Sequence, residues 1–270
     1  MDLTVDVARA GAFVRARGSA RDCARLEGVF GRTEPERAVV EELERLQNPD
    51  GGFPLMDRPG GPSSVDATCY ILSQLRDLPP LAGSPMASRA VAFLRRSQGV
   101  DGSWEESPEA AAASPPWAQA ADPRARAYLT AVAAYTLQVM DPAHADPIAR
   151  ASDWLRAALA GGPERAYSQT LFLAAAVWGR HLEPGAPERD RAYDLLERRE
   201  LAAPELAWWL TTFVELGLEA RYLALVLRQL RRLAGMQRED GGWPAEEGLA
   251  VESTLTALRV FRGFGLVGPS

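Results

Sequence analysis

Residues 89–104 read Arg-Ala-Val-Ala-Phe-Leu-Arg-Arg-Ser-Gln-Gly-Val-Asp-Gly-Ser-Trp, and this stretch decides the fold. The apolar residues before Gln98 recur at helical spacing, which predicts an amphipathic helix. The Asp101-Gly102 pair then ends the helix, because glycine reaches positive φ easily and aspartate favours turns. The ring of Trp104 can cover this turn, and the Gln98 amide can bond the free ends of neighbouring helices. The stretch therefore predicts a structural clip and not a catalytic device.

The pattern Gln-x-x-Asp-Gly-x-aromatic occurs at two further places, residues 47–53 and 237–243. Fainter copies of the helical half, which begins Arg-Ala, occur at 9–14, 150–155 and 191–196. Repetition of one unit along the chain is typical of repeat architectures in which each unit packs against its neighbours.

A second type of helix lies between the clips, apolar on every face and therefore expected to be buried. These helices are predicted at roughly 20–30, 64–77, 125–140, 165–180, 204–217 and 250–264. The helices that end in clips carry charge on one face, as at 41–45. Six pairs of outer and inner helices predict an all-α fold, an (α/α)6 barrel (toroid) of six helical hairpins, as one domain over 1–270. The Ala- and Pro-rich stretch 103–123 is the one long loop, and we expect it to cover one mouth of the barrel.

The composition is that of a globular protein, 47% hydrophobic with a formal net charge of -6. The acidic balance argues against nucleic acid as the main partner. All 30 basic residues are arginine, which excludes Schiff-base and P-loop lysine chemistry. The two cysteines provide no disulfide framework. No leader and no apolar run long enough to span a bilayer are visible, so we expect a cytoplasmic protein with no integral membrane segment.

The full form Arg-Ala-x-x-Phe-Leu-x-x-x-Gln-x-x-x-Gly-x-Trp at 89–104 resembles the QW motif. That motif marks the superfamily of squalene-hopene cyclases, class II terpene cyclases and protein prenyltransferase β-subunits. The resemblance covers most of the chain as repeats. It implies an α/α toroid whose central cavity is lined by apolar and aromatic residues, and an isoprenoid ligand. Squalene cyclases carry two such barrels, whereas this chain has the length for one.

Residues 64–69, Ser-Val-Asp-Ala-Thr-Cys, match the position of the family's Asp-x-Asp-Asp-Thr-Ala motif at the start of an inner helix. The resemblance implies that Asp66, the middle acid, is the general acid that protonates an alkene or epoxide, with Thr68 following as expected. Ser64 and Ala67 replace the first and third acids. Such an acid must be buried, neutral and strengthened by hydrogen bonds, one of which Ser64 could supply.

A structural interpretation of Asp66 stands beside this catalytic one, because an acid at a helix start can cap the helix. Acids occupy the same column of four hairpins, at Asp22, Asp66, Glu205 and Glu252. We expect these four acids to form a negative rim at one mouth of the barrel. Such a rim repels a diphosphate and suits a neutral or cationic ligand.

The prenyltransferase branch requires zinc, held by an aspartate, a cysteine two residues later and a histidine on a later inner helix. Asp66 and Cys69 are three residues apart here. His144 falls in a Pro-rich turn and His181 at the end of an inner helix. We therefore expect no metal and no cofactor.

Aromatic residues on the inner helices are candidates for the cavity lining, where their π faces would stabilise carbocations. The candidates for ligand binding are the aromatic residues Tyr70, Tyr128, Trp208 and Trp209, for which filling the core is the alternative role, and the polar residues Ser64, Thr68, Glu205 and Glu252. Adjacent residues on a helix point in different directions, so we expect one of Trp208 and Trp209 to face the cavity.

Three functional hypotheses remain open from the sequence. The first is a single-barrel terpene cyclase-like enzyme with Asp66 as the general acid. The second is a non-catalytic toroid that binds a lipid or a protein partner. The third is a carboxylate-dependent hydrolase that pairs Asp66 with Glu252 or Glu205.

Overall fold

A computed structural model of the chain describes residues 4–31, 34–119, 121–182 and 186–268. The contacts divide the chain into two compact units. One unit is continuous in sequence and comprises residues 40–199, whereas the other combines residues 1–39 with residues 200–270. Each unit is described by itself.

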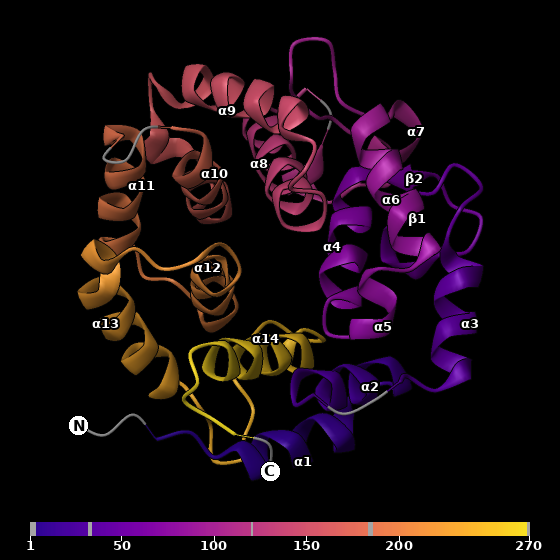
Figure 1. Cartoon of the computed structure of the whole chain (residues 1–270), viewed down its shortest axis with the longest axis vertical. Coiled ribbons are helices and arrows are strands. Elements are labelled where there is room, and N and C mark those ends of the chain that lie inside the picture. Colours follow the sequence, from indigo (N-terminus) through magenta and orange to yellow (C-terminus); the bar gives the residue numbers. More distant parts are fainter. Residues whose placement is uncertain (1–3, 32–33, 120, 183–185, 269–270) are drawn as a thin grey trace. The chain divides into compact units, whose positions relative to one another are not determined.

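The 40–199 unit contains three inner helices, α4 (Val65–Leu75), α8 (Pro123–Met140) and α10 (Ser168–His181). They pack side by side, with α8 touching both α4 and α10 (Figure 1). The outer helices are α3 (Arg37–Leu46), whose first turn precedes residue 40, α6 (Pro85–Arg96), α9 (Ala145–Leu159) and α11 (Pro187–Glu197). Short elements complete the unit: β1 (Phe53–Pro54), η1 (Leu55–Asp57), β2 (Ser63–Ser64), α5 (Pro79–Ala82), α7 (Pro108–Ala111), η2 (Pro116–Ala118) and η3 (Pro163–Arg165).

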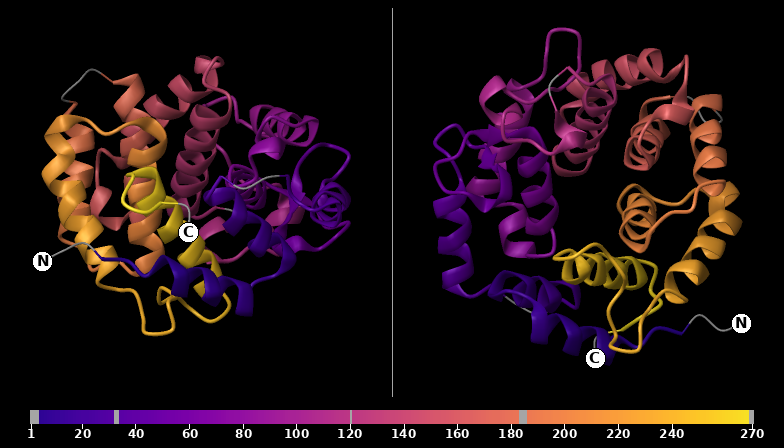
Figure 2. Two further views of the ribbon diagram at one scale, coloured as in Figure 1. Left: turned by 60° about the horizontal axis from the view of Figure 1, so that its bottom comes forward. Right: turned by 180° about the vertical axis from the view of Figure 1, so that it is seen from behind.

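The other unit contains the inner helices α2 (Ala20–Val29), α12 (Ala203–Leu216) and α14 (Ala250–Gly263). Helix α14 packs against both α12 and α2. The outer helices are α1 (Val7–Arg17) and α13 (Leu223–Ala234), the latter preceded by η4 (Ala220–Tyr222). Figure 2 shows α1, from the beginning of the chain, beside α14, from its end.

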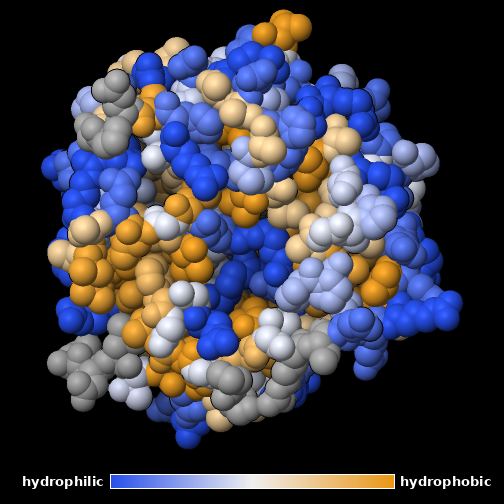
Figure 3. Space-filling view, in the orientation of Figure 1, coloured by the Kyte–Doolittle hydropathy of each residue, from blue (hydrophilic) through white to orange (hydrophobic). Residues whose placement is uncertain are grey.

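The pattern of burial follows the apolar pattern of the sequence. Inner helix α10 is buried without interruption from Thr170 to Trp178. Outer helix α3 buries a single stripe, formed by Val39, Leu43 and Leu46, and leaves its acidic side in water. Hydrophilic side chains accordingly dominate the periphery of the face shown in Figure 3.

All six predicted inner helices are present in the described residues, within a few residues of their predicted ends. Two features differ from the prediction. The stretch 103–123 is not a plain loop, because it forms the short helices α7 and η2. Strands were not expected, yet Phe53–Pro54 pairs with Ser63–Ser64 in an antiparallel ladder. No helix among the described residues has both the length and the apolar character needed to cross a membrane.

The clips join each turn to the helices that follow it. In each clip a glycine takes positive φ, as at Gly51, Gly102 and Gly241. The N–H of the clip aromatic donates to a threonine hydroxyl on the next inner helix: Phe53 to Thr68, Trp104 to Thr130 and Trp243 to Thr254. The glutamine amide donates to a carbonyl at the start of the next outer helix: Gln47 to Met86, Gln98 to Pro147 and Gln237 to Asp6.

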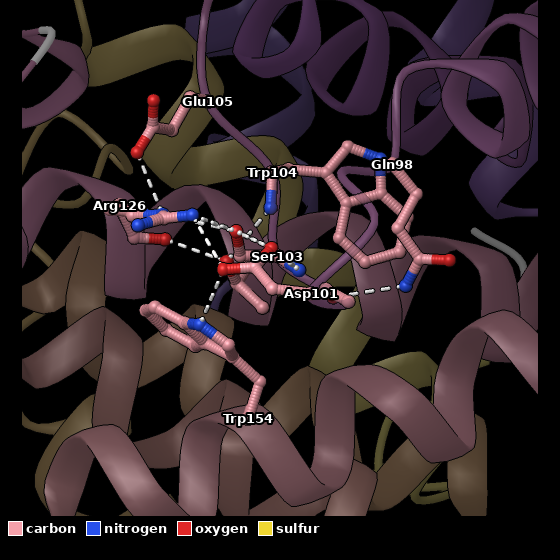
Figure 4. Close-up of polar contacts among 9 residues, drawn as sticks. Gln98, Asp101, Ser103, Trp104, Glu105, Arg126 and Trp154 are labelled. Carbon is pink, nitrogen blue, oxygen red and sulfur yellow. Dashed lines mark hydrogen bonds and ion pairs between the residues drawn. The ribbon is translucent and has the colours of Figure 1, made fainter.

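The second clip has additional polar contacts (Figure 4). Arg126 of α8 lies 2.7 Å from both Asp101 and Glu105, and Trp154 of α9 donates to Asp101 at 3.2 Å. Trp104, whose indole is fully buried, donates to the carbonyl of Leu94. This clip therefore fixes the beginning of the stretch 103–123, which supplies residues to the start of α4.

Candidate functional site

The N-terminus of α4 is capped by two residues other than Asp66. The hydroxyl of Ser64 accepts from the N–H of Ala67 at 3.1 Å. The carboxyl of Glu106 accepts from the N–H of Val65 at 2.9 Å and from the N–H of Asp66 at 3.0 Å. Ser64 also donates to Glu106 at 2.7 Å. The free amides of the helix start are thus satisfied without the side chain of Asp66.

The side chain of Asp66 instead accepts one hydrogen bond on each carboxyl oxygen. The hydroxyl of Tyr128, from α8, donates to Oδ1 at 2.8 Å. The indole Nε1 of Trp117, from η2, donates to Oδ2 at 3.1 Å. The hydrogen bonds of the Asp66 carboxyl thus go to side chains of other elements, while its place in the first turn of α4 still complements the helix N-terminus.

Burial raises the pKa of Asp66, and the hydrogen bonds from Tyr128 and Trp117 act in the opposite direction. Asp66 keeps some surface accessible to solvent, but protein atoms surround its carboxyl group and exclude most of the water from it. A carboxyl oxygen has two lone pairs, so each oxygen retains one after accepting a single bond. Asp66 thus combines a raised affinity for its proton with two donors that stabilise the carboxylate left after the proton leaves.

Two other titratable groups beside Asp66, Tyr128 and Cys69, are held neutral. Burial raises the pKa of Tyr128, so its hydroxyl remains a donor. Burial also raises the pKa of the Cys69 thiol, which lies on the next turn of α4. A thiol with a raised pKa is a poor nucleophile, so Asp66 is the group at this site suited to proton transfer.

The remaining acids of the predicted column have different partners. Asp22 forms a capping box with Ser19 at the start of α2. Glu205 accepts from the N–H of Ala202 at the start of α12. Glu252 accepts two hydrogen bonds from the fully buried Arg25, at 2.6 and 2.9 Å. Arg25 also lies 3.5 Å from Asp22 and so offsets the charge of both acids; the negative rim remains a prediction.

Two sequence predictions about residues beside Asp66 need correction. Ser64 was expected to bond Asp66, but its hydroxyl donates to Glu106 because the helix start brings that carboxyl closer. Thr68 was a candidate for ligand binding, but it has no exposed surface. Its hydroxyl donates to the carbonyl of Ser64 and accepts from the N–H of Phe53. Thr68 therefore belongs to the clip.

The aromatic candidates divide by exposure. Tyr70, one turn after Asp66 on α4, is 44% exposed. Trp209 is buried beside Phe213, with ring centroids 6.4 Å apart, whereas Trp208 keeps part of its surface accessible. Tyr70 and Tyr128 lie in the 40–199 unit with Asp66, whereas Trp208, Trp209, Glu205 and Glu252 belong to the other unit.

Two residues of the site were missed in the sequence, Glu106 and Trp117. Both lie in the stretch 103–123, which was interpreted as a covering loop. Two sequence features could have pointed to them. Glu106 is an acid shortly after the second clip, and Trp117 is a lone tryptophan in an Ala- and Pro-rich segment. Trp117 is 48% exposed although its indole bonds Asp66, whereas Glu106 is buried.

No group of three or more His, Cys, Asp and Glu side chains that could hold a metal occurs in the part of the chain that the structure describes. His144 bonds Asp141 at the start of α9, and His181 is the last residue of α10. His181 thus lies at the end of an inner helix, as predicted, and His144 directly precedes α9.

Comparison with known proteins gives a structural likeness only. No family model matches the chain, and no curated protein matches it. The solved structures that match include two of variants of the type II terpene cyclase MstE from Scytonema. The first, without ligand, has a TM-score of 0.61 at 15% identity and covers 95% of each chain. The second, in complex with its substrate geranylgeranyl dihydroxybenzoate, has a TM-score of 0.64 at 14% identity and covers 97% of each chain.

The likeness confirms the predicted fold class, the all-α fold of six helical hairpins that the cyclase structures share. It extends over nearly the whole of both chains, as expected for a chain with the length of a single barrel. The prediction of one domain over 1–270 stays a prediction.

Proposed function

We propose that the protein is a terpene cyclase-like enzyme that protonates an isoprenoid chain with Asp66 and so initiates cyclisation. One observation carries the proposal: each oxygen of the Asp66 carboxyl accepts a hydrogen bond from a neutral donor, Tyr128 or Trp117, in a site whose burial raises its pKa. An acid that only capped α4 would direct its oxygens to the amides that Ser64 and Glu106 occupy.

The proposed reaction begins when Asp66 gives its proton to one carbon of a terminal alkene and the π electrons form the new C–H bond. The cation left on the other carbon is attacked by the next double bond of the chain, which closes a ring. A proton lost at the end restores neutrality, so the product is an isomer of the substrate. Tyr128 and Trp117 stabilise the Asp66 carboxylate while the cation exists.

The fold supports an isoprenoid as the substrate class, because one structure that shares it holds geranylgeranyl dihydroxybenzoate. A polyprenyl chain carried by an aromatic acid is therefore the first compound to test. Tyr70 is partly accessible and lies one turn after Asp66, so it is the aromatic residue of this unit that we propose to contact the chain. We expect the cavity that receives the chain to be apolar.

The test is incubation of the purified protein with geranylgeranyl dihydroxybenzoate in D2O, followed by mass spectrometry of the product. We expect an isomer of the substrate that carries one additional deuterium, because the initiating proton comes from an exchangeable carboxyl. Asp66→Asn should lower turnover by a factor of at least about 10² to 10⁴, the usual contribution of a general acid.

The asparagine substitution fits the site without strain. Its carbonyl oxygen can accept from Trp117, which is only a donor, and its amide can donate to the hydroxyl oxygen of Tyr128. Asp153→Asn is the matched control, since Asp153 is exposed on outer helix α9 of the same unit. This control should retain full turnover.

Three outcomes contradict the proposal. Equal turnover of Asp66→Asn and wild type removes Asp66 as the acid. Tight binding of prenylated compounds of several lengths without turnover of any supports the alternative of a non-catalytic toroid that binds a lipid or a protein partner. A cleaved product, with water added, supports the hydrolase alternative.

A further inference from the structure

Three donors from consecutive residues converge on the carboxyl of Glu106. Its Oε1 accepts from the Ser64 hydroxyl at 2.7 Å and from the N–H of Asp66 at 3.0 Å. Its Oε2 accepts from the N–H of Val65 at 2.9 Å. Glu106 is 6% exposed, so little water competes for these bonds. The turn that carries Asp66 is therefore held by a carboxyl from a segment 40 residues further along the chain.

We propose that Glu106 and Asp66 form one carboxyl pair, in which Glu106 positions the acid-bearing turn and its negative charge holds the proton on Asp66. Glu106 is a positioning residue, because it acts on the substrate only through Asp66. The catalytic meaning of the pair rests on the proposed function, whereas the pair itself is a property of the free protein.

The donors around each carboxyl indicate where the charge lies. Glu106 accepts two backbone amides at a helix N-terminus, an arrangement that favours an anion. Asp66 accepts two neutral side-chain donors. Glu106 has three donors, two of them at a helix N-terminus, against two for Asp66, so we place the charge on Glu106 and the proton on Asp66.

The titration of the two carboxyls is coupled. Burial raises the pKa of both, and the repulsion between the two carboxyls raises the pKa of whichever ionises second. Two such groups lose their protons in linked steps, because the first negative charge opposes the second. The other titratable groups facing Asp66 are Tyr128 from α8 and Cys69 from α4, and burial raises the pKa of each, which keeps both neutral.

The pair also accounts for the positions where residues 64–69 depart from the motif they resemble. Ser64 and Ala67 stand where that motif has acids, so α4 itself contributes only one carboxyl to this turn. Glu106 brings a second carboxylate to the same turn from outside the helix.

Stability against pH reports the proton on Asp66 without any substrate. A folded-state pKa raised above the unfolded value means that the folded protein binds more protons between the two values. The free energy of unfolding then falls as pH rises through this window. Asp66→Asn removes this fall, so the pH above which the difference between the variant and wild type stops changing reports the titration of Asp66 in the folded protein.

The experiment measures urea unfolding from about pH 4 to about pH 9 for wild type, Asp66→Asn, Glu106→Gln and the double variant. With Glu106→Gln in place, we expect the effect of Asp66→Asn to end at a pH lower by about one unit or more, because loss of the neighbouring charge makes Asp66 easier to ionise. That shift is roughly a tenfold loss of proton affinity. If the effect of Asp66→Asn ends at the same pH with and without Glu106→Gln, the proposal is overturned.

Two variants distinguish the effect of the negative charge of Glu106 from the effect of its hydrogen bonds to the start of α4. Glu106→Asp keeps the charge and shortens the side chain by one methylene, and Ser64→Ala removes one hydrogen bond to the same carboxyl. Both should lower the free energy of unfolding while leaving the titration of Asp66 close to that of wild type. A shift in either variant as large as that of Glu106→Gln contradicts the role of the charge.

A second measurement serves if Glu106→Gln does not fold. The infrared difference between wild type and Asp66→Asn isolates the protonated carboxyl band of Asp66. The pair predicts that this band persists well above the ordinary aspartic acid pKa of about 3.9 and disappears in a step linked to Glu106. Loss of the band near the ordinary value overturns the proposal.

The rate of cyclisation against pH distinguishes the pair from the proposed function. A general acid must be protonated, so the rate should fall as pH rises through the pKa of Asp66 and should fall at lower pH in Glu106→Gln. If Glu106→Gln shifts the pH dependence of unfolding but neither wild type nor any variant turns over substrate, the pair is supported and the proposed function is contradicted. If wild type turns over substrate but Glu106→Gln leaves the pH dependence of unfolding unshifted, the proposed function is supported and the pair is contradicted.

Discussion

Tyr128 occupies on α8 the position that Asp66 occupies on α4, and its hydroxyl donates to Asp66 Oδ1 at 2.8 Å. Each residue lies two positions before a threonine, Thr68 or Thr130, that accepts the N–H of a clip aromatic. Because the clips fix the two threonines in the same way, they set neighbouring helices at the same level. The donor and the acid therefore meet as equivalent positions of adjacent repeats.

Tyr128→Phe should reduce the cyclisation rate by about 10- to 150-fold. The phenol donates to a group that becomes a carboxylate during the reaction, and a hydrogen bond to a charged group contributes about 1.5–3 kcal/mol. The measurement is kcat with the compound used to test Asp66. Tyr135→Phe, on the same helix and buried to a similar extent, is the matched control. Equal effects of the two substitutions contradict the assignment.

Trp117→Phe should have a smaller effect, about 3- to 10-fold on kcat, because the indole is 48% exposed and water can replace its bond to Asp66. The substitution retains an aromatic ring and removes only the N–H donor. Trp117→Ala removes the ring as well and serves as the comparison. If Trp117→Phe equals wild type while Trp117→Ala is impaired, the ring matters and the hydrogen bond does not.

Arg25→Met should lower the free energy of unfolding by about 3 kcal/mol, because it leaves the carboxylate of Glu252 without its buried partner. Urea unfolding at neutral pH measures the change. Arg15→Met is the control in the same unit, since Arg15 and Glu27 form an exposed pair whose loss should cost less than about 1 kcal/mol. Similar losses in both variants contradict the importance of the buried pair.

Gly241→Ala and Gly248→Ala test the close approach of the third clip, at Gly241, to the backbone of Arg9 in α1. Both glycines have positive φ, +91° at Gly241 and +84° at Gly248. A Cβ at Gly241 lies 2.4 Å from the carbonyl of Arg9, whereas a Cβ at Gly248 meets nothing within 4 Å. We expect a loss of roughly 1 kcal/mol at Gly248 from the backbone alone, and on the order of 3 kcal/mol or more at Gly241.

Thermal melting of the two alanine variants decides between the two contributions. A lower melting temperature for Gly241→Ala than for Gly248→Ala supports steric contact with the chain of Arg9. The same melting temperature for both means that the turn conformation alone accounts for the glycine.

The helices could be predicted because their signals are local. The Gln-x-x-Asp-Gly-x-aromatic pattern ends each clip-bearing helix within a few residues, and the apolar runs before Met140 and Trp178 have no polar face to place in water. The strands at Phe53 and Ser64 have no comparable signal, since the turn of the first clip brings two-residue segments together.

The site was predictable only in part. Asp66 could be named from its place at the start of an inner helix, and Tyr128 because it is an aromatic residue on an inner helix. Glu106 and Trp117 lie outside the repeat, and nothing in the spacing shows that their side chains reach α4. Asp22 and Glu252 share the column of Asp66, yet only the structure shows that Arg25 neutralises them.

The third clip has a consequence for synthesis of the chain. Gln237 exchanges two hydrogen bonds with Asp6, which precedes it by 231 residues. Residues 40–199 are continuous and can fold while translation proceeds, whereas α1 must wait for the clip and for α14, against which it packs. Contacts between distant segments form slowly. Helix α1 therefore leaves the ribosome long before α14 and can pack only against α2 until α14 emerges.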